Sequence, residues 1–178
     1  MEWNKKILIS HLSDLSASID IVIKEKKQLP ALIILYSTID ILAWLYHPVK
    51  YEEVRRSDFI KWCDQFLLPG EKLKCTSKDL YSARCGILHS YSAYSNMSRK
   101  GDAKQIWYSW GKADVQKFEQ IINLSSYKNI AIAVQIESLI TALKNGIIRF
   151  AEFVDKNPEI EKLVFSRAEK FFSNIPHE

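Results

Sequence analysis

ALIILYSTIDILAWLY, residues 31–46, is the stretch that decides the class of fold. Its polar residues are only Ser37, Thr38 and Asp40. A helix that is apolar nearly all round is typical of the centre of a bundle, because each of its faces needs apolar cover. Pro30 favours a helix start at this point, and His47-Pro48 favours an end. The sequence therefore predicts a buried central helix.

Helical spacing continues on both sides of this stretch. Apolar residues recur at intervals of three and four from Leu8 to Val22, and again from Ile132 to Val154. Gly146 is a candidate for a kink or a division in the second helix. Shorter helices are expected at 57–66, 77–91, 114–124 and 157–172, capped by Ser57, Ser77 and Asn157. No run alternates polarity as a strand does, so we expect an all-α fold, an antiparallel bundle of about four main helices plus short ones.

The chain has 178 residues, which suits one domain spanning 1–178. Residues 94–112 break the helical pattern with many Ser, Asn, Gly and Lys residues, and a loop insertion is expected there, with at most a short extended piece. One interpretation is a lid that grips RNA, because aromatic rings stack on bases and cations bind phosphate. The other is a solvated loop whose aromatic rings pack against the bundle. The residues concerned are Arg99, Lys100, Lys104, Trp107, Tyr108 and Trp110.

Composition excludes several classes of protein. Apolar residues make up 47% and charged residues 26%, which is typical of globular chains and not of disordered ones. Three cysteines without a CxxC pair, and only four histidines, argue against a disulfide scaffold and a zinc module and fit a reducing compartment. The uncharged run 29–39 is too short to span a bilayer. We expect a cytoplasmic protein without metal or cofactor, whose net charge of +4 permits an anionic partner.

One segment, DLYSARCGILHSY at 79–91, holds residues that could carry chemistry. On a helix, Arg84 and Tyr91 share one face at an offset of about 20°, whereas His89 is rotated from Arg84 by about 140° and lies roughly 7.5 Å along the axis. A long arginine can still converge with the imidazole on a shared phosphate, without the two stacking. A crevice between helices or subunits would suit such a site. The alternative is a bundle helix with an incidental motif.

The Arg84-x4-His89-x-Tyr91 pattern within an all-α bundle resembles the HEPN family (higher eukaryotes and prokaryotes nucleotide-binding). HEPN proteins are helical bundles, commonly dimeric, and many are metal-independent ribonucleases with an Arg-x4–6-His motif. The most similar variant is the HEPN toxin paired with a nucleotidyltransferase-like antitoxin, whose motif also ends in His-x-Tyr. Cys85 departs from the family, which usually has a polar residue such as Asn or Asp after the arginine.

The resemblance implies a metal-independent RNA endonuclease, acting as a toxin or an antiviral effector. His89 would be the general base or acid, because imidazole changes its charge near neutral pH. Arg84 would hold the scissile phosphate, and the product would carry a 2′,3′-cyclic phosphate. Tyr91 would position the site and be the residue that a nucleotidyltransferase-like antitoxin modifies. The implied partners are a second copy of the chain, RNA and that antitoxin.

Asp40 needs partners because it lies in the most apolar helix. It could pair with Arg84 or His89 and join the site, or it could accept structural hydrogen bonds from Tyr, Trp or a helix cap, the more common arrangement. The alternative function is a noncatalytic HEPN-like helical domain that dimerises or binds a nucleotide or a partner. A nuclease should present Arg84 and His89 in a cleft, whereas a scaffold could pair Arg84 with an internal carboxylate.

Overall fold

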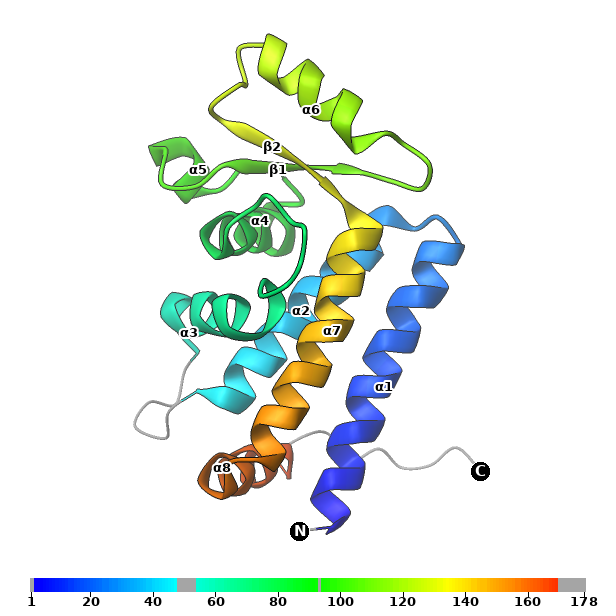
Figure 1. Ribbon diagram of the computed structural model, residues 1–178, viewed down its shortest axis with the longest axis vertical. Coiled ribbons are helices and arrows are strands. Elements are labelled where there is room, and N and C mark those ends of the chain that lie inside the picture. Colours follow the sequence, from blue (N-terminus) through cyan, green and yellow to red (C-terminus); the bar gives the residue numbers. More distant parts are fainter. Residues whose placement is uncertain (1, 48–53, 93, 170–178) are drawn as a thin grey trace.

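The computed structural model describes residues 2–47, 54–92 and 94–169 (Figure 1). About 70% of the chain is helical, with eight α-helices and one two-stranded sheet in this described part, which confirms the all-α class in its coarse form. The helices are α1 (Glu2–Lys24), α2 (Gln28–Tyr46), α3 (Arg56–Trp62), α4 (Ser77–Ser90), α5 (Asn96–Lys100), α6 (Val115–Leu124), α7 (Ile136–Asp155) and α8 (Pro158–Ala168). A π-helical turn, η1 (Cys63–Leu67), continues α3, and the strands are β1 (Gln105–Ser109) and β2 (Ala131–Gln135).

Helix α2 lies at the centre of the fold, as predicted. It contacts α1, α3, α4, α7 and α8. Its residues Leu35, Tyr36, Ile39, Leu42 and Leu45 are fully buried. Figure 1 shows α1, α2 and α7 side by side along the long axis of the molecule, with α3, α4 and α8 lying across them. Helix α1 runs opposite to α2 and α7, but α2 and α7 share one direction, so the expected antiparallel order holds only in part.

The length and apolar character of α2 are also those of a candidate membrane span. Within the described residues it is the one helix long and apolar enough to cross a membrane, with a mean hydropathy of 1.7. Half of that span is buried inside the protein. Core helices of globular proteins and membrane spans share these properties. The cytoplasmic location and the absence of membrane association therefore stay predictions.

The sheet was not predicted. Strands β1 and β2 pair in parallel, from Gln105 opposite Ala131 to Ser109 opposite Gln135. Helix α6 connects them and covers the sheet with Ile122 and Phe118, which pack with Trp107, Tyr127, Ala131 and Ala133 in a second small core. The prediction of a loop over 94–112 is wrong for α5, whereas β1 matches the short extended piece that the prediction allowed there. The prediction of helix from Ile132 is wrong for β2. Residues 131–135 are nearly all buried, and pairing with β1 gives their backbone N–H and C=O groups hydrogen-bond partners.

Helix α7 is continuous through Gly146, so the predicted division is absent. A Cβ at this position would lie 3.1 Å from the Phe66 carbonyl oxygen and 3.2 Å from Leu67 Cα. Gly146 therefore allows η1 to approach the α7 backbone closely.

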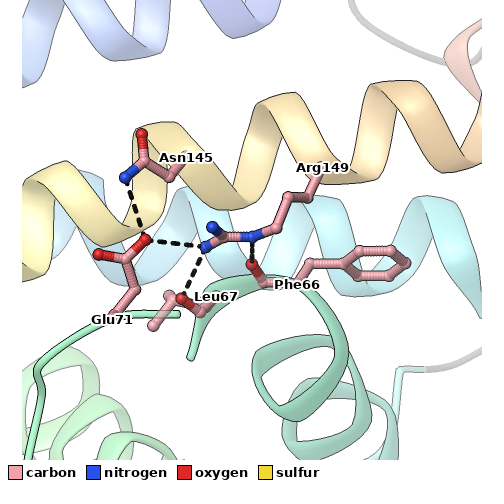
Figure 2. Close-up of polar contacts among 5 residues, drawn as sticks. All are labelled: Phe66, Leu67, Glu71, Asn145 and Arg149. Carbon is pink, nitrogen blue, oxygen red and sulfur yellow. Dashed lines mark hydrogen bonds and ion pairs between the residues drawn. The ribbon is translucent and has the colours of Figure 1, made fainter. Parts of the chain in front are cut away.

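Arg149 of α7 forms hydrogen bonds across this contact between α7 and η1 (Figure 2). Its Nε donates to the carbonyl oxygen of Phe66 at 2.6 Å, and its Nη2 donates to that of Leu67 at 3.0 Å. Nη2 also contacts Glu71 Oε1 at 3.1 Å, and Asn145 Nδ2 donates to the same oxygen at 3.0 Å. The carbonyls at the end of a helix have no partner within it, so Arg149 supplies one from a neighbouring helix.

We expect Arg149→Met to lower the free energy of unfolding by about 2–3 kcal/mol, because it leaves half-buried carbonyls and a carboxylate without their donor. The control is Lys144→Met on the same helix, which removes an exposed ion pair with Asp20. That change should cost less than about 1 kcal/mol. Urea denaturation measures both, and equal losses would contradict the role assigned to Arg149.

Candidate functional site

A capping box fixes the start of α4, the helix that carries the motif. Thr76 Oγ1 accepts from the backbone N–H of Asp79 at 3.2 Å, and Asp79 Oδ2 accepts from the backbone N–H of Thr76 at 2.8 Å. The cap is thus Thr76, one residue before the predicted Ser77. Asp79 Oδ1 also accepts from the backbone N–H of Lys104 at 2.6 Å. This buried carboxylate therefore ties α4 to the segment that leads into β1.

Asp40 and Arg84 form an ion pair between α2 and α4. Arg84 Nε and Nη2 each lie 2.8 Å from Asp40 Oδ2. The two side chains are 24% and 23% exposed. Of the two arrangements open to Asp40, the structure therefore has the pair with Arg84. The more common one, a structural hydrogen bond to Tyr, Trp or a helix cap, is not the one found. The two donors converge on one oxygen, which fixes the direction of the guanidinium plane.

The two members of this pair respond differently to their surroundings. Burial raises the pKa of Asp40 above its usual 3.8, and the hydrogen bond and charge of Arg84 offset this only partly. Burial lowers the pKa of Arg84, but its bond to Asp40 and the Asp40 charge outweigh this, so the pKa of Arg84 is raised. The guanidinium therefore stays charged at any pH at which the protein is folded, and the carboxyl is the member that can be neutralised.

His89 meets Arg84 directly. Arg84 Nη1 lies 3.3 Å from His89 Nε2. A guanidinium can only donate, so Nε2 is the acceptor in this contact. The long side chain of Arg84 bridges the axial distance between the two residues, so that they contact each other. Their convergence on a shared phosphate stays a prediction. His89 is also exposed, so its ring is accessible from solvent.

An open groove of about 530 Å³ lies beside His89. Its walls come from α3, α4, α5 and the connection before α5. The lining residues are Arg56, Tyr81, Cys85, His89, Ser90, Tyr94, Ser95, Asn96, Met97 and Arg99. Arg84 and Asp40 do not line it, but Arg84 reaches it through His89. We call this feature the His89 groove.

Tyr91 stands apart from the other motif residues. Helix α4 ends at Ser90, and Tyr91 adopts the left-handed conformation with φ 49° and ψ 35°. It is 71% exposed and does not line the His89 groove. Tyr91 is the residue at which helical geometry ends, and the face that it would share with Arg84 stays a prediction.

The reversal of the chain after α4 requires Gly86. The backbone N–H of Ser92 donates to the Gly86 carbonyl oxygen at 3.1 Å. A Cβ on Gly86 would lie only 2.3 Å from the carbonyl oxygen of Ser92 and 3.2 Å from that of Tyr94. No side chain fits at this position without moving the segment that forms one wall of the His89 groove.

Of the two interpretations of residues 94–112, the RNA-gripping lid is not supported by the aromatic rings, because these rings are part of the packing. Trp107 packs on Tyr127 at 4.9 Å, the Tyr108 hydroxyl bonds to that of Tyr36, and Trp110 packs on the main core. The interpretation with packed aromatic rings is confirmed, although on a strand and not a solvated loop. Of the candidate cations, Arg99 lines the His89 groove, whereas Lys100 is exposed at the end of α5 and does not.

Among the groove residues that sequence reasoning missed are Arg56, Tyr94 and Asn96. Arg56 reaches it from α3, and its Cζ lies 5.9 Å from the centre of the Tyr81 ring. Tyr94 is 50% exposed, and Asn96 Oδ1 accepts from Arg99 Nη2 at 3.0 Å. Only the fold joins Arg56 to the motif, and no periodicity marks Tyr94 or Asn96. Across the described ranges, no group of three or more His, Cys, Asp and Glu side chains could hold a metal ion.

No family model matches the sequence, and neither curated proteins nor solved structures show a significant match. The function is therefore argued from the residues and their geometry.

We expect Gly86→Ala to lower the free energy of unfolding by about 1–3 kcal/mol, because the methyl group would overlap the Ser92 carbonyl. Helix propensity alone would favour the alanine by about 1 kcal/mol. Thermal or urea denaturation measures the change. Lys78→Ala, at an exposed position of α4, is the control, and a stabilised Gly86→Ala would contradict the close approach.

The raised pKa of Asp40 gives stability a defined pH dependence. The folded state holds the Asp40 proton more tightly than the unfolded chain, so this contribution is present below pH 3.8 and is lost as pH rises through the raised pKa. We expect the free energy of unfolding of the wild type, minus that of Asp40→Asn, to decrease as pH rises above 3.8. Urea titrations at several pH values test this, and a difference that increases with pH would contradict it.

Proposed function

We propose that this chain is a HEPN-like, metal-independent RNA endonuclease with Arg84 and His89 as its catalytic residues. The observation that carries the proposal is the contact of 3.3 Å between Arg84 Nη1 and His89 Nε2 at the His89 groove, with the guanidinium held by Asp40. The helical architecture supports a HEPN-like bundle, with the β1-α6-β2 unit as an addition to it. The Arg-x4-His-x-Tyr spacing supports the same assignment.

The proposed reaction needs no metal, and its nucleophile is the 2′-hydroxyl of the RNA and not water. The 2′-oxygen attacks the adjacent phosphorus, the bond from phosphorus to the 5′-oxygen breaks, and a 2′,3′-cyclic phosphate forms. Either His89 removes the 2′-hydroxyl proton and solvent protonates the 5′-oxygen, or His89 protonates the 5′-oxygen and solvent takes up the 2′-hydroxyl proton. Arg84 offsets the charge that develops on the phosphate oxygens.

The hydrogen bond between Arg84 and His89 suggests an order of events. While Arg84 Nη1 donates to Nε2, the lone pair of the imidazole is occupied. A phosphate is a stronger acceptor for a guanidinium than a neutral imidazole. Substrate phosphate would therefore draw Nη1 away and free Nε2 for the 2′-hydroxyl. The base becomes available only when the substrate is in place.

The remaining parts of the proposal concern partners. The protein would act as a homodimer and as a toxin or an antiviral effector, and a nucleotidyltransferase-like antitoxin would modify Tyr91. The exposure of the Tyr91 side chain, 71%, supports access by such an enzyme. Modification would add bulk and negative charge close to the end of α4, which opposes binding of RNA. The cytoplasm is the compartment this function would need.

A second candidate is a noncatalytic HEPN-like domain that dimerises or binds a nucleotide or a partner. The observation that favours it is the Asp40–Arg84 ion pair, because a carboxylate offsets the charge that phosphate binding would use. In this alternative Arg84 only joins α2 to α4. The two candidates differ in the effect of removing the His89 side chain, which makes no contribution to the core. Its removal lowers RNA cleavage in the nuclease and changes no activity in the noncatalytic domain.

We expect wild-type protein in EDTA to cleave RNA and leave 2′,3′-cyclic phosphate ends. His89→Ala should lower the cleavage rate at least about 100-fold, the usual loss of a general acid or base. Arg84→Ala should lower the cleavage rate by a similar factor. Arg84→Lys should restore little of the rate, because lysine lacks the forked set of donors with which a guanidinium can bond to Asp40 and phosphate at once. Gel analysis of labelled RNA measures the rates.

The control is His11→Ala, which removes a histidine from α1, outside the His89 groove. It should cleave as the wild type does. Equal activity in all variants would mean a contaminating nuclease. A folded wild type that cleaves none of a broad panel of RNAs would exclude the nuclease and leave the noncatalytic domain. Toxicity on expression that His89→Ala abolishes would favour the toxin among the nuclease assignments.

A further inference from the structure

We infer that Arg56 and Arg99, which enter the His89 groove from α3 and α5, bind the RNA phosphates next to the scissile one, and that Tyr94 stacks on an unpaired base between them. This inference rests on the proposed function. It assigns a binding site to residues outside the Arg-x4-His-x-Tyr motif, and it names the ligand as single-stranded RNA.

The first argument is the distribution of charge. Asp40 offsets the charge of Arg84, so that arginine adds little net field to the groove. Among the residues that the structure describes, the lining holds Arg56 and Arg99 and no carboxylate. Within the ranges that the structure describes, neither of these two arginines has a carboxylate partner. The positive charge that a polyanion would meet is therefore at Arg56 and Arg99, on either side of the motif in sequence.

The second argument is that both arginines are held in place by neutral groups. Arg56 Cζ lies 5.9 Å from the centre of the Tyr81 ring, which is itself packed edge-on against Phe59 at 5.4 Å. Arg99 Nη2 donates to Asn96 Oδ1 at 3.0 Å. Such contacts orient a guanidinium without neutralising it, so less side-chain freedom is lost when phosphate binds.

The helix that carries Arg99 is fixed relative to α4. Ser95 Oγ accepts from the backbone N–H groups of Met97 and Ser98, at 3.1 and 3.2 Å, and so caps α5. The same hydroxyl bonds to Ser82 Oγ of α4 at 2.6 Å, and this contact is buried. Arg99 and His89 are thus placed by one polar connection between their helices.

The third argument is the exposed aromatic ring. Tyr94 lines the groove and is 50% exposed. Aromatic rings stack on the bases of single strands in a way that tolerates any sequence. The bases of a duplex are already stacked and paired, so Tyr94 has no face to meet there. The groove therefore suits an unpaired strand.

Arg56 also extends the site along α3. It lines a second, shallow depression of about 770 Å³ together with Arg55, Lys61 and one carboxylate, Asp64. A strand that leaves the His89 groove past Arg56 meets further cations there. The site is accordingly longer than the single phosphate at which the chemistry would occur.

The test is equilibrium binding of a fluorescent oligouridylate with 2′-O-methyl groups, which cannot be cleaved, to the full-length protein at several salt concentrations. Arg56→Gln and Arg99→Gln should each weaken binding about five- to tenfold. Each should also make the slope of log K against log salt shallower by about 0.7, and the double variant by about 1.4, because each removes one phosphate contact on a single strand. Arg56→Lys should keep the wild-type slope.

Two controls are included. One distinguishes charge at the groove from the total charge of the protein, and the other distinguishes the effect of charge from that of stacking. Lys162→Gln removes the same charge from α8, away from the groove, and should leave the affinity and the slope unchanged. Tyr94→Leu should weaken binding about tenfold with no change in slope, and Tyr94→Phe should restore it.

The inference is overturned if the wild type fails to bind the probe at low salt, or if the arginine variants keep the wild-type slope. Equally tight binding of polyglutamate would overturn it as well, because the site would then be a general polyanion surface. RNA cleavage with unchanged slopes leaves the nuclease standing and removes this site. Reduced slopes without cleavage of any RNA keep this site and remove the nuclease.

Discussion

Helix α2 is stable in water only if other helices cover most of its circumference, because nearly all of its side chains are apolar. Helices α1, α3, α4, α7 and α8 supply that cover. The same requirement applies to its one charged residue, since a carboxylate in such surroundings needs a partner. Asp40 pairs with Arg84. The burial of α2 and the position of the motif on α4 therefore both follow from the need of α2 for cover and for a partner to its carboxylate.

Sequence reasoning succeeded where periodicity was long and failed where an apolar run was short. Helices α1 and α7 follow from spacing, and α2 follows from its long apolar run between Pro30 and His47. The run Ala131–Gln135 fits a helix and a strand equally well, because a few consecutive apolar residues carry no period. Its partner, β1, lies 26 residues earlier in a segment that is rich in polar residues around its aromatic core. The pairing between them is a long-range contact, which no local pattern contains.

The site also has parts that the local sequence predicts and parts that only long-range contacts determine. Arg84 and His89 lie on one helix, so their contact follows from helical geometry and the length of an arginine. Tyr91 does not, because the chain leaves helical geometry at that residue, and the reason lies in how tightly Ser92 approaches Gly86. Arg56 comes from another helix, and it is joined to the motif by its contact with the Tyr81 ring and by the packing of Tyr81 against Phe59. Packing of this kind depends on the three-dimensional arrangement of helices, which spacing does not encode.

In the proposed nuclease, the Asp40–Arg84 pair would separate two tasks that cleavage of RNA requires of cations. An arginine bonded to a carboxylate is well oriented but contributes little long-range attraction, so Arg84 suits the task of directing His89 and receiving one phosphate. Attraction of the strand needs charge that a carboxylate does not offset, and among the described residues of the groove Arg56 and Arg99 carry such charge. A protein built in this way needs only a modest net charge, here +4, because the field that matters is local to the groove. The offset charge of Arg84, which by itself favours a scaffold, is therefore compatible with a nuclease whose binding and chemistry use different arginines.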